Sequence, residues 1–77
     1  MKMPHVIVKM WPGQSEAKKK RLAAKIAQDV MEVLNYGEEA VSVAIQEIKS
    51  SDWAVQVYEP EIKAKWEMLY KKPGYEM

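Results

Sequence analysis

The first apolar segment of the chain, residues 4–11, alternates between two kinds of side chain and predicts a β-strand. Its two faces are Val6, Val8 and Met10 on one side and His5, Ile7, Lys9 and Trp11 on the other. A repeat of two residues is typical of a strand with one buried face. Pro4 is tolerated only at the first position, because proline has no N–H to donate to a neighbouring strand. Pro12-Gly13 then ends the strand.

A helical repeat follows and predicts a helix that begins after Ser15 and ends near Leu34. Ser15 is suited to the N-cap, and Glu16 to the first turn. Gly37 is predicted to end the segment in a left-handed conformation. The apolar positions that recur at helical spacing are Leu22, Ala23, Ile26, Ala27, Val30, Met31, Val33 and Leu34.

Strand alternation returns in residues 40–48. A strand, a helix and a second strand without a hairpin turn predict a right-handed βαβ unit with parallel strands. The helix-facing residues of the second strand would be Val41, Val43 and Ile45. The opposite sheet face would hold Ile7, Trp11, Ser42 and Ala44. That face is too apolar to be left in water, so we expect a second copy of the chain to cover it in a homodimer.

The last third of the chain is predicted to end in a second helix. Ser50-Ser51-Asp52 breaks the second strand, and residues 53–58 fit either a short strand or a turn. Glu59-Pro60 is suited to open a helix, which Pro73-Gly74 ends. The predicted fold class is therefore α/β, a βαβ unit with parallel strands plus a C-terminal helix. Residues 1–77 would form a single domain, assembled as a dimer.

Length and composition narrow the routes by which this chain becomes stable. A chain of 77 residues has a thin core and usually depends on disulfides, a metal or self-association. It has no cysteine, which excludes disulfides, and its single histidine, His5, argues against a metal site. Self-association is the remaining route, in agreement with the apolar sheet face.

The charge of the chain gives no case for nucleic acid or for an acidic membrane surface as a partner. The net charge is +1, and no apolar stretch approaches the length of a membrane span. The N-terminus lacks the apolar core of a signal peptide, so a cytoplasmic location is expected. The basic run Lys18-Lys19-Lys20-Arg21 fans around a helix, and we interpret it as a solvated face.

Most generic catalytic machinery is absent from the sequence, including a Gly-rich phosphate loop, a paired-carboxylate dyad and a serine nucleophile elbow. Pro4 remains, because its ring nitrogen would be a secondary amine, able to act as a general base, if the chain began there. Behind Met1-Lys2-Met3 the same nitrogen is a non-basic amide, whereas translation from Met3 would expose it. His5 is the next candidate base, because histidine is a common general base in enzymes. Trp53 fits either a packing role or a pocket lining.

From Pro4 onward the chain resembles the 4-oxalocrotonate tautomerase family of the tautomerase superfamily. The resemblance rests on Met-Pro at the head of a strand, the βαβ order, Gly13-Gln14-Ser15 before the helix, and the second-strand sequence of residues 41–47. The closing Lys71-Lys72-Pro73-Gly74-Tyr75 and the longer C-terminal helix are similar to the small dimeric branch, the PptA-type tautomerases.

This resemblance implies a keto–enol tautomerase that uses no cofactor and no metal. Pro4 would be the general base, since an apolar pocket disfavours its ammonium form and lowers the pKa of the amine toward neutrality. The family's pocket arginines map onto Gln14 and Ser42, and its aromatic wall maps onto Trp53. Arg21, the only arginine, lies at neither position, so the clamp for a dicarboxylate is missing. The expected substrate is a small 2-oxo acid or a related enol.

Two alternatives stay open at this point. If Met1-Lys2-Met3 persists, Pro4 is blocked, and the chain would be a non-catalytic oligomeric module with the same fold. The other alternative is a hydratase or dehalogenase of the same superfamily, which ranks lower because arginines to activate water or to hold a carboxylate are lacking.

Overall fold

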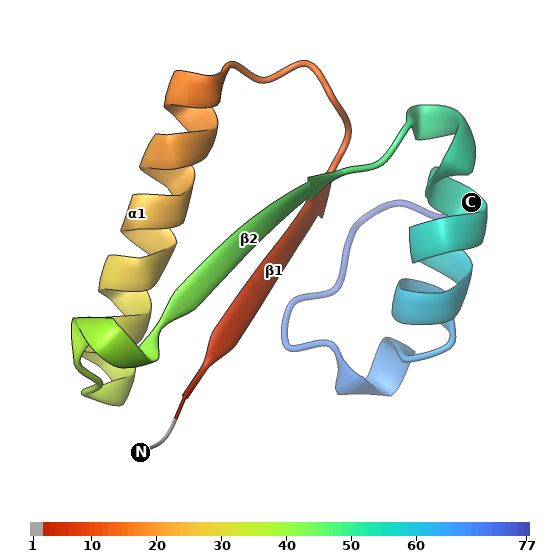
Figure 1. Cartoon of the computed structure of the whole chain (residues 1–77). Coiled ribbons are helices and arrows are strands. Elements are labelled where there is room, and N and C mark those ends of the chain that lie inside the picture. The colour runs from red at the N-terminus through yellow and green to blue at the C-terminus, as the bar shows by residue number, and fades with distance from the viewer. Residues whose placement is uncertain (1–2) are drawn as a thin grey trace. The chain divides into compact units, whose positions relative to one another are not determined.

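The computed structural model describes residues 3–77, which divide into two compact units (Figure 1). The first unit ends at Glu47, and the second runs from Ile48 to Met77. Met1 and Lys2, two of the three residues predicted to precede the catalytic proline, lie outside the described residues. Each unit is described by itself below.

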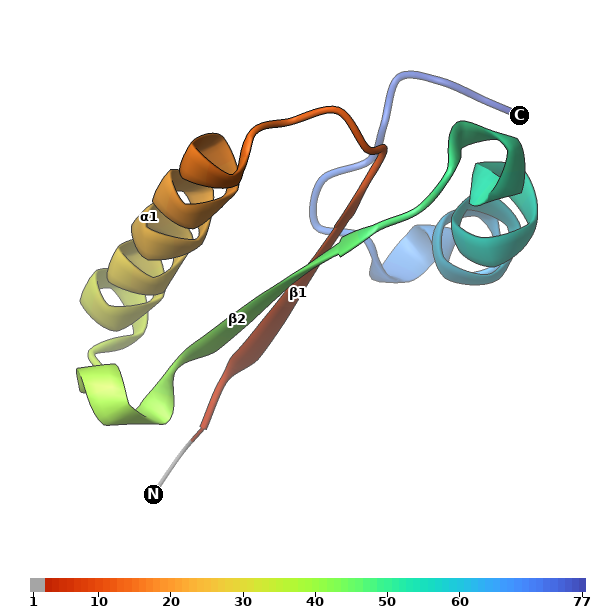
Figure 2. The ribbon, with the colours of Figure 1, turned by 45° about the horizontal axis from the view of Figure 1, so that its top comes forward.

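The first unit is the predicted βαβ unit. It consists of β1 (His5–Met10), α1 (Glu16–Leu34), a short 3-10 helix η1 (Glu38–Ala40) and β2 (Ser42–Glu47). The strands pair in parallel, in a register that runs from His5 opposite Ser42 to Met10 opposite Glu47. Figures 1 and 2 show the two strands side by side, with α1 running along them. The predicted fold class is confirmed.

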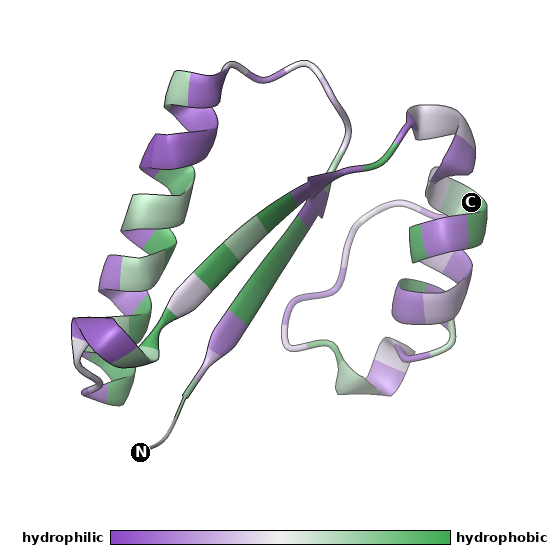
Figure 3. Ribbon diagram, in the orientation of Figure 1, coloured by the Kyte–Doolittle hydropathy of each residue, from purple (hydrophilic) through white to green (hydrophobic). Residues whose placement is uncertain are grey.

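The sheet presents one face to α1, as the alternation predicts. Val43 and Ile45 line a hollow of about 230 Å³ together with Ala23 of α1. The middle of both strands is hydrophobic in Figure 3. On the other face Ile7 is 48% exposed, and Trp11, just past the end of β1, is 54% exposed. These apolar side chains are accessible in a single chain.

Helix α1 begins where the sequence predicts, because Ser15 caps it. The Ser15 Oγ accepts a hydrogen bond from the backbone N–H of Lys18 at 3.2 Å. The apolar stripe is narrower than predicted, since Val33 is 80% exposed. The half-buried apolar residues of the helix are Ala23, Ile26, Ala27, Val30 and Met31. They follow the i, i+3, i+4, i+7, i+8 spacing of one helix face.

The exit from α1 differs from the prediction. Asn35 takes the left-handed conformation, with φ 59° and ψ 49°, and Gly37 has an ordinary φ of −78°. Asparagine tolerates this region better than other residues with a side chain. The helix ends at Leu34, as predicted, and only the residue in the left-handed conformation differs.

An ion pair ties the start of α1 to the end of β2. The Lys19 Nζ lies 2.8 Å from Oε1 of Glu16 and 3.5 Å from Oε2 of Glu47. The hydrogen bond from Lys19 to Glu16, with the charges of Glu16 and Glu47, raises the pKa of Lys19 above its ordinary value. The same amine thus contacts both elements of the βαβ crossover.

The second unit contains the predicted C-terminal helix, but at an earlier place. It consists of a short 3-10 helix η2 (Ser50–Asp52), a wide helix of π type η3 (Ala54–Lys63) and a second short 3-10 helix η4 (Trp66–Met68). Residues 54–58 are helical, so a strand or a turn there is wrong. Pro60 lies inside η3 and does not open it.

Burial explains why the helix starts early. Val57 and Tyr58, on η3, are each 5% exposed, and Ala40, at the end of η1, is also buried. The Tyr58 ring lies 5.7 Å from the ring of Tyr75, measured between centroids. Packing of Val57 and Tyr58 within the second unit outweighs the preference of Pro60 for a first helical turn. Among the described residues, the buried apolar residues are Ala40 in the first unit and Val57 and Tyr58 in the second, so the core of each unit is thin.

No helix among the described residues combines the length and the apolar character that a membrane crossing requires.

Candidate functional site

Pro4 is held at the head of β1 by a backbone hydrogen bond. Its carbonyl accepts the N–H of Ser42 at 3.3 Å, and the residue itself is half-buried. The lack of an N–H on proline leaves no ladder bond unmade at this first position. Met3, which precedes Pro4, is 73% exposed. The nitrogen of Pro4 therefore lies at an accessible end of the sheet.

Ser42 is brought to Pro4 by the strand register. It opens β2 directly opposite His5, and its Oγ lies 2.6 Å from the His5 Nδ1. The two side chains are both exposed. The structure thus groups Pro4, His5 and Ser42 at one end of the sheet, within a single chain.

Gln14 lies at the other end of the sheet. Gly13 precedes it with a φ of 125°, a conformation that residues with a side chain rarely adopt. This turn carries Gln14 into a groove of about 300 Å³ between the first turns of α1 and Met10. β1 has six residues at about 3.3 Å each, so Gln14 is roughly 20 Å from Pro4. One chain does not bring Gln14 and Pro4 together.

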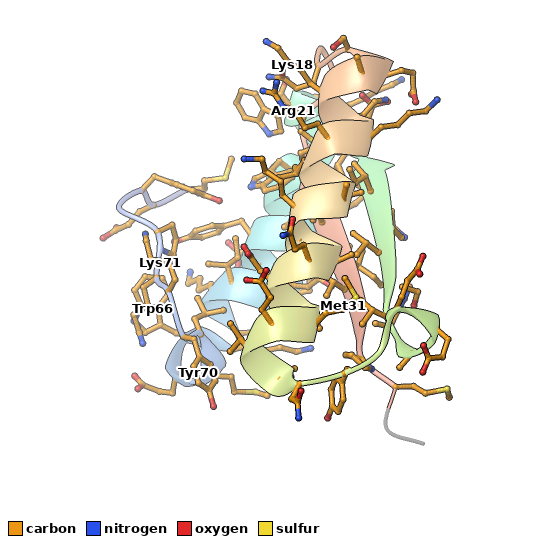
Figure 4. The ribbon with its side chains drawn as sticks, turned by 90° about the vertical axis from the view of Figure 1, so that its left-hand side faces the viewer. Lys18, Arg21, Met31, Trp66, Tyr70 and Lys71 are labelled. Carbon is orange, nitrogen blue, oxygen red and sulfur yellow. The ribbon has the colours of Figure 1, made fainter. Side chains whose placement is uncertain are left out.

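The groove beside Gln14 also contains basic side chains that the sequence treats as a solvated face. Its basic residues are Lys18, Lys19, Arg21 and Lys25. Lys18 and Arg21 project from the first turns of α1 in Figure 4. Arg21 lies at neither position that matches the family's arginines, but Arg21 and Gln14 line the same groove. The i, i+3, i+7 spacing of Lys18, Arg21 and Lys25 is the signal that could have indicated this grouping.

Trp53 belongs to the second unit, at the start of η3. Its Nε1 donates a hydrogen bond to the Tyr75 hydroxyl at 3.0 Å, and the side chain is half-buried. Tyr75 in turn contacts Tyr58. This arrangement gives Trp53 a packing role in its own unit.

Among residues 3–77 no group of His, Asp and Glu side chains is arranged to hold a metal ion. What the described residues of the first unit do hold together is a proline, a histidine and a hydroxyl at one end of the sheet, and a groove with amide and cationic groups at the other.

Comparison with known proteins places this fold and this proline in a family. Residues 4–61 match the family described as Tautomerase enzyme, so the match begins at Pro4 itself. A probable tautomerase from Xylella fastidiosa (strain 9a5c) is 45% identical over 73 residues, which cover 95% of this chain and 89% of the relative. Tautomerase PptA from Enterobacter sp. (strain 638) is 41% identical over 76 residues, which cover 97% of this chain and all of the relative.

The solved structures agree with the sequence relatives. The crystal structure of YwhB, a homologue of 4-oxalocrotonate tautomerase, matches with a TM-score of 0.64 at 33% identity. That match covers 70% of this chain and 88% of YwhB. The resemblance carried by the residues from Pro4 onward is confirmed: the chain belongs to the tautomerase family.

Proposed function

We propose that this chain is a cofactor-independent keto–enol tautomerase, and that the amine of Pro4 is its general base in the form of the chain that begins at Pro4. Membership of the tautomerase family supports isomerase activity. The single observation that carries the role of Pro4 is that the family match begins at this residue, which heads β1 at an accessible end of the sheet.

The chemistry needs one amine and a way to hold the substrate. The Pro4 nitrogen takes the proton from the enol hydroxyl, and the electrons of that O–H bond form the C=O bond. The electron pair of the C=C bond then takes the proton back from the Pro4 ammonium and forms a C–H bond. One proton has moved from oxygen to carbon, and no oxidant or reductant is involved. An amine of modest basicity suits both steps.

A second copy of the chain completes this site in the proposal. Ile7 and Trp11 are exposed and the core is thin, which supports self-association through the sheet face they share. A two-fold axis perpendicular to the strands reverses the strand direction in the partner. It places the Gln14 end of one protomer next to the Pro4 end of the other. Gln14 would then orient the substrate across the interface, and Ser42 would do so within one chain.

The proposed substrate class follows from the two residues that match the family's pocket arginines. Gln14 and Ser42 are neutral hydrogen-bonding groups, which suit a carbonyl or one carboxylate better than a dicarboxylate. A small 2-oxo acid or a related enol fits this set. Trp53 would form an apolar wall for an aryl substituent. The family match crosses Glu47 into the second unit, which supports one tautomerase-like domain across both units. The proposal extends this domain over residues 1–77 and places the protein in the cytoplasm.

A labelling experiment tests the proposed reaction. The chain that begins at Pro4 is mixed with the enol of phenylpyruvate in D2O, and the loss of the enol is followed by its ultraviolet absorbance. A positioned ammonium delivers deuterium to one face of the carbon, so the product should be labelled stereoselectively and faster than in buffer. Racemic labelling at the buffer rate would support the non-catalytic module instead.

A further inference from the structure

We infer that His5 is a positioning residue, which fixes the direction in which the Ser42 hydroxyl points at the substrate. This inference rests on the proposed function, because it concerns the same end of the sheet. It adds a residue that the resemblance assigns no role.

Three links join His5, Ser42 and Pro4. Ser42 donates its backbone N–H to the Pro4 carbonyl at 3.3 Å. His5 and Ser42 stand opposite each other in the parallel register, so their side chains point to the same sheet face. Their Nδ1 and Oγ atoms are 2.6 Å apart, which is a close hydrogen bond. The serine hydroxyl is therefore fixed relative to the first residue of β1.

In a single chain this pair is exposed, which argues against a role in the folding of that chain. Both side chains are exposed, and an exposed hydrogen bond between side chains adds little to the free energy of folding, because water replaces it when it breaks. Its physical consequence is orientation. A serine hydroxyl carries one proton and two lone pairs, and without a partner it rotates among its staggered positions.

The donor in this hydrogen bond depends on the tautomer of His5, and the inference concerns the tautomer whose Nδ1 carries the hydrogen. When the Nδ1–H of His5 donates to the Oγ of Ser42, the hydroxyl proton of Ser42 is free to point away from the ring. It can then donate to an oxygen of the substrate, which a carboxylate or a carbonyl group needs. In this arrangement His5 acts on the substrate through Ser42 and not by direct contact.

The predicted kinetic signature is a change in KM. The carboxylate of a 2-oxo acid keeps its charge during tautomerisation, so an oriented donor to it binds substrate and transition state alike. The loss of a hydrogen bond of this kind raises KM about tenfold and leaves kcat nearly unchanged. A histidine that acted as the base would change kcat instead.

The chain offers a matched pair of substitutions. The amide of asparagine places a donor nitrogen near the position of Nδ1, whereas the longer glutamine places it near the position of Nε2. The test therefore compares H5A, H5N, H5Q, S42A and the H5A/S42A double variant, all in the chain that begins at Pro4. Phenylpyruvate enol is the substrate for turnover, and phenylpyruvate itself is the probe for binding by NMR titration. Circular dichroism checks that each variant is folded.

We expect H5A and H5Q to raise KM and the Kd for phenylpyruvate about tenfold, and H5N to restore both. H5A should add nothing in the S42A background, because the two residues act as one unit. Three results would each overturn the inference. H5A could raise KM equally with and without the Ser42 hydroxyl, H5N and H5Q could have the same KM and Kd, or the loss could be confined to kcat. The Kd values for phenylpyruvate could follow this order while none of these chains, including the one without substitutions, turns over the enol. In that case the proposed function fails and the positioning role of His5 stands.

Discussion

Pro4 and Gln14 lie at opposite ends of β1, separated by six strand residues and roughly 20 Å. No rotation of the glutamine side chain covers that distance. If both residues serve one substrate, they come from two copies of the chain. The site is then a property of the assembly, whereas Ser42 and His5 contact each other within one chain.

Mixing two defective chains tests this arrangement. One chain begins at Met1, so that its Pro4 nitrogen is an amide while Gln14 is intact. The other begins at Pro4 and carries Gln14→Ala. In a mixed dimer, the amine of the second chain meets the Gln14 of the first, and one of the two sites is complete. The two chains are mixed in equal amounts while unfolded and are then refolded together. Half of the dimers should be mixed, and each mixed dimer has one complete site of two, so about a quarter of the wild-type number of sites should be restored.

The control for this experiment is each chain refolded alone, which should show less activity than the mixture. Light scattering should give about twice the chain mass for every sample. Activity of the mixture equal to the mean of the two separate samples would mean that Gln14 does not act across the interface. A stable folded monomer would contradict the role of the sheet face itself.

The neutral residues at the two positions that match the family's arginines predict a preference among substrates. With Gln14 and Ser42 at the matching positions, kcat/KM should be higher for an aryl or alkyl 2-oxo acid enol than for a dicarboxylate dienol, since no bidentate arginine clamp is present. Steady-state kinetics with both substrates measures this. Equal or better turnover of the dicarboxylate would be incompatible with this account. Arg21→Ala would then identify the source of charge, because Arg21 shares the groove with Gln14.

Trp53 has two roles that substitution can separate. If its ring is the pocket wall, Trp53→Ala should lower kcat/KM for an aryl substrate about tenfold more than for an alkyl substrate. Tyr75→Phe is the matched control, since it removes the acceptor of the Trp53 Nε1 hydrogen bond and leaves the indole in place. Tyr75→Phe should therefore lower stability only slightly, because this hydrogen bond is exposed, and should leave the aryl preference unchanged. A loss of stability in Trp53→Ala with an unchanged aryl preference would assign Trp53 to packing alone.

The Lys19 ion pairs predict a stability effect with a defined pH dependence. Lys19→Met removes the contacts to Glu16 and Glu47, so it should lower the urea midpoint more than Lys20→Met. Lys20 is the control, because the structure gives it no ion pair within residues 3–77. The pKa of Lys19 is raised above 10.5. Its contribution is therefore complete below pH 10.5 and is lost as the pH rises through the raised pKa.

High salt gives an independent check on this effect. Both side chains of the Lys19–Glu16 pair are in contact with solvent, so 1 M NaCl should shrink the difference between the two variants. A difference that is unchanged by salt would mean that the aliphatic stem of Lys19, and not its charge, holds α1 against β2.

The sequence predicts the first unit well because several local signals agree there. The two strands have a period of two, Ser15 caps α1, and a crossover without a hairpin turn requires parallel strands. The helix exit is less certain from sequence, since Asn35 and Gly37 both tolerate the left-handed region and only packing decides between them. Val33 is in the helical repeat but near the end of α1, where it is left exposed.

The second unit is harder to predict because tertiary packing overrides local preference. Residues 54–58 include two valines and a tyrosine, residue types that favour a strand, yet Val57 and Tyr58 are buried on a helix. Pro60 is a helix starter by propensity and lies inside one. Figure 4 shows Trp66, Tyr70 and Lys71 beyond that helix, in a region predicted to continue it.

Part of the candidate site can be predicted from the sequence, and part of it depends on the fold. The role of Pro4 can be predicted, because a proline at the head of a strand is a secondary amine when it is the N-terminal residue. The contact between His5 and Ser42 depends on the strand register, which joins residues 37 positions apart. The distance between Pro4 and Gln14 likewise depends on the extended conformation of β1 between them.

The most direct test of the account compares the enol turnover of two forms of this chain, one beginning at Met1 and one at Pro4. Intact mass identifies each form, and circular dichroism should show the same fold in both. The Pro4 form should be faster by about 10²–10⁴-fold, the contribution typical of a positioned general base, with a pH profile that reports an amine near neutrality. Equal rates for the two forms would contradict the central claim, because an amide nitrogen cannot accept the proton.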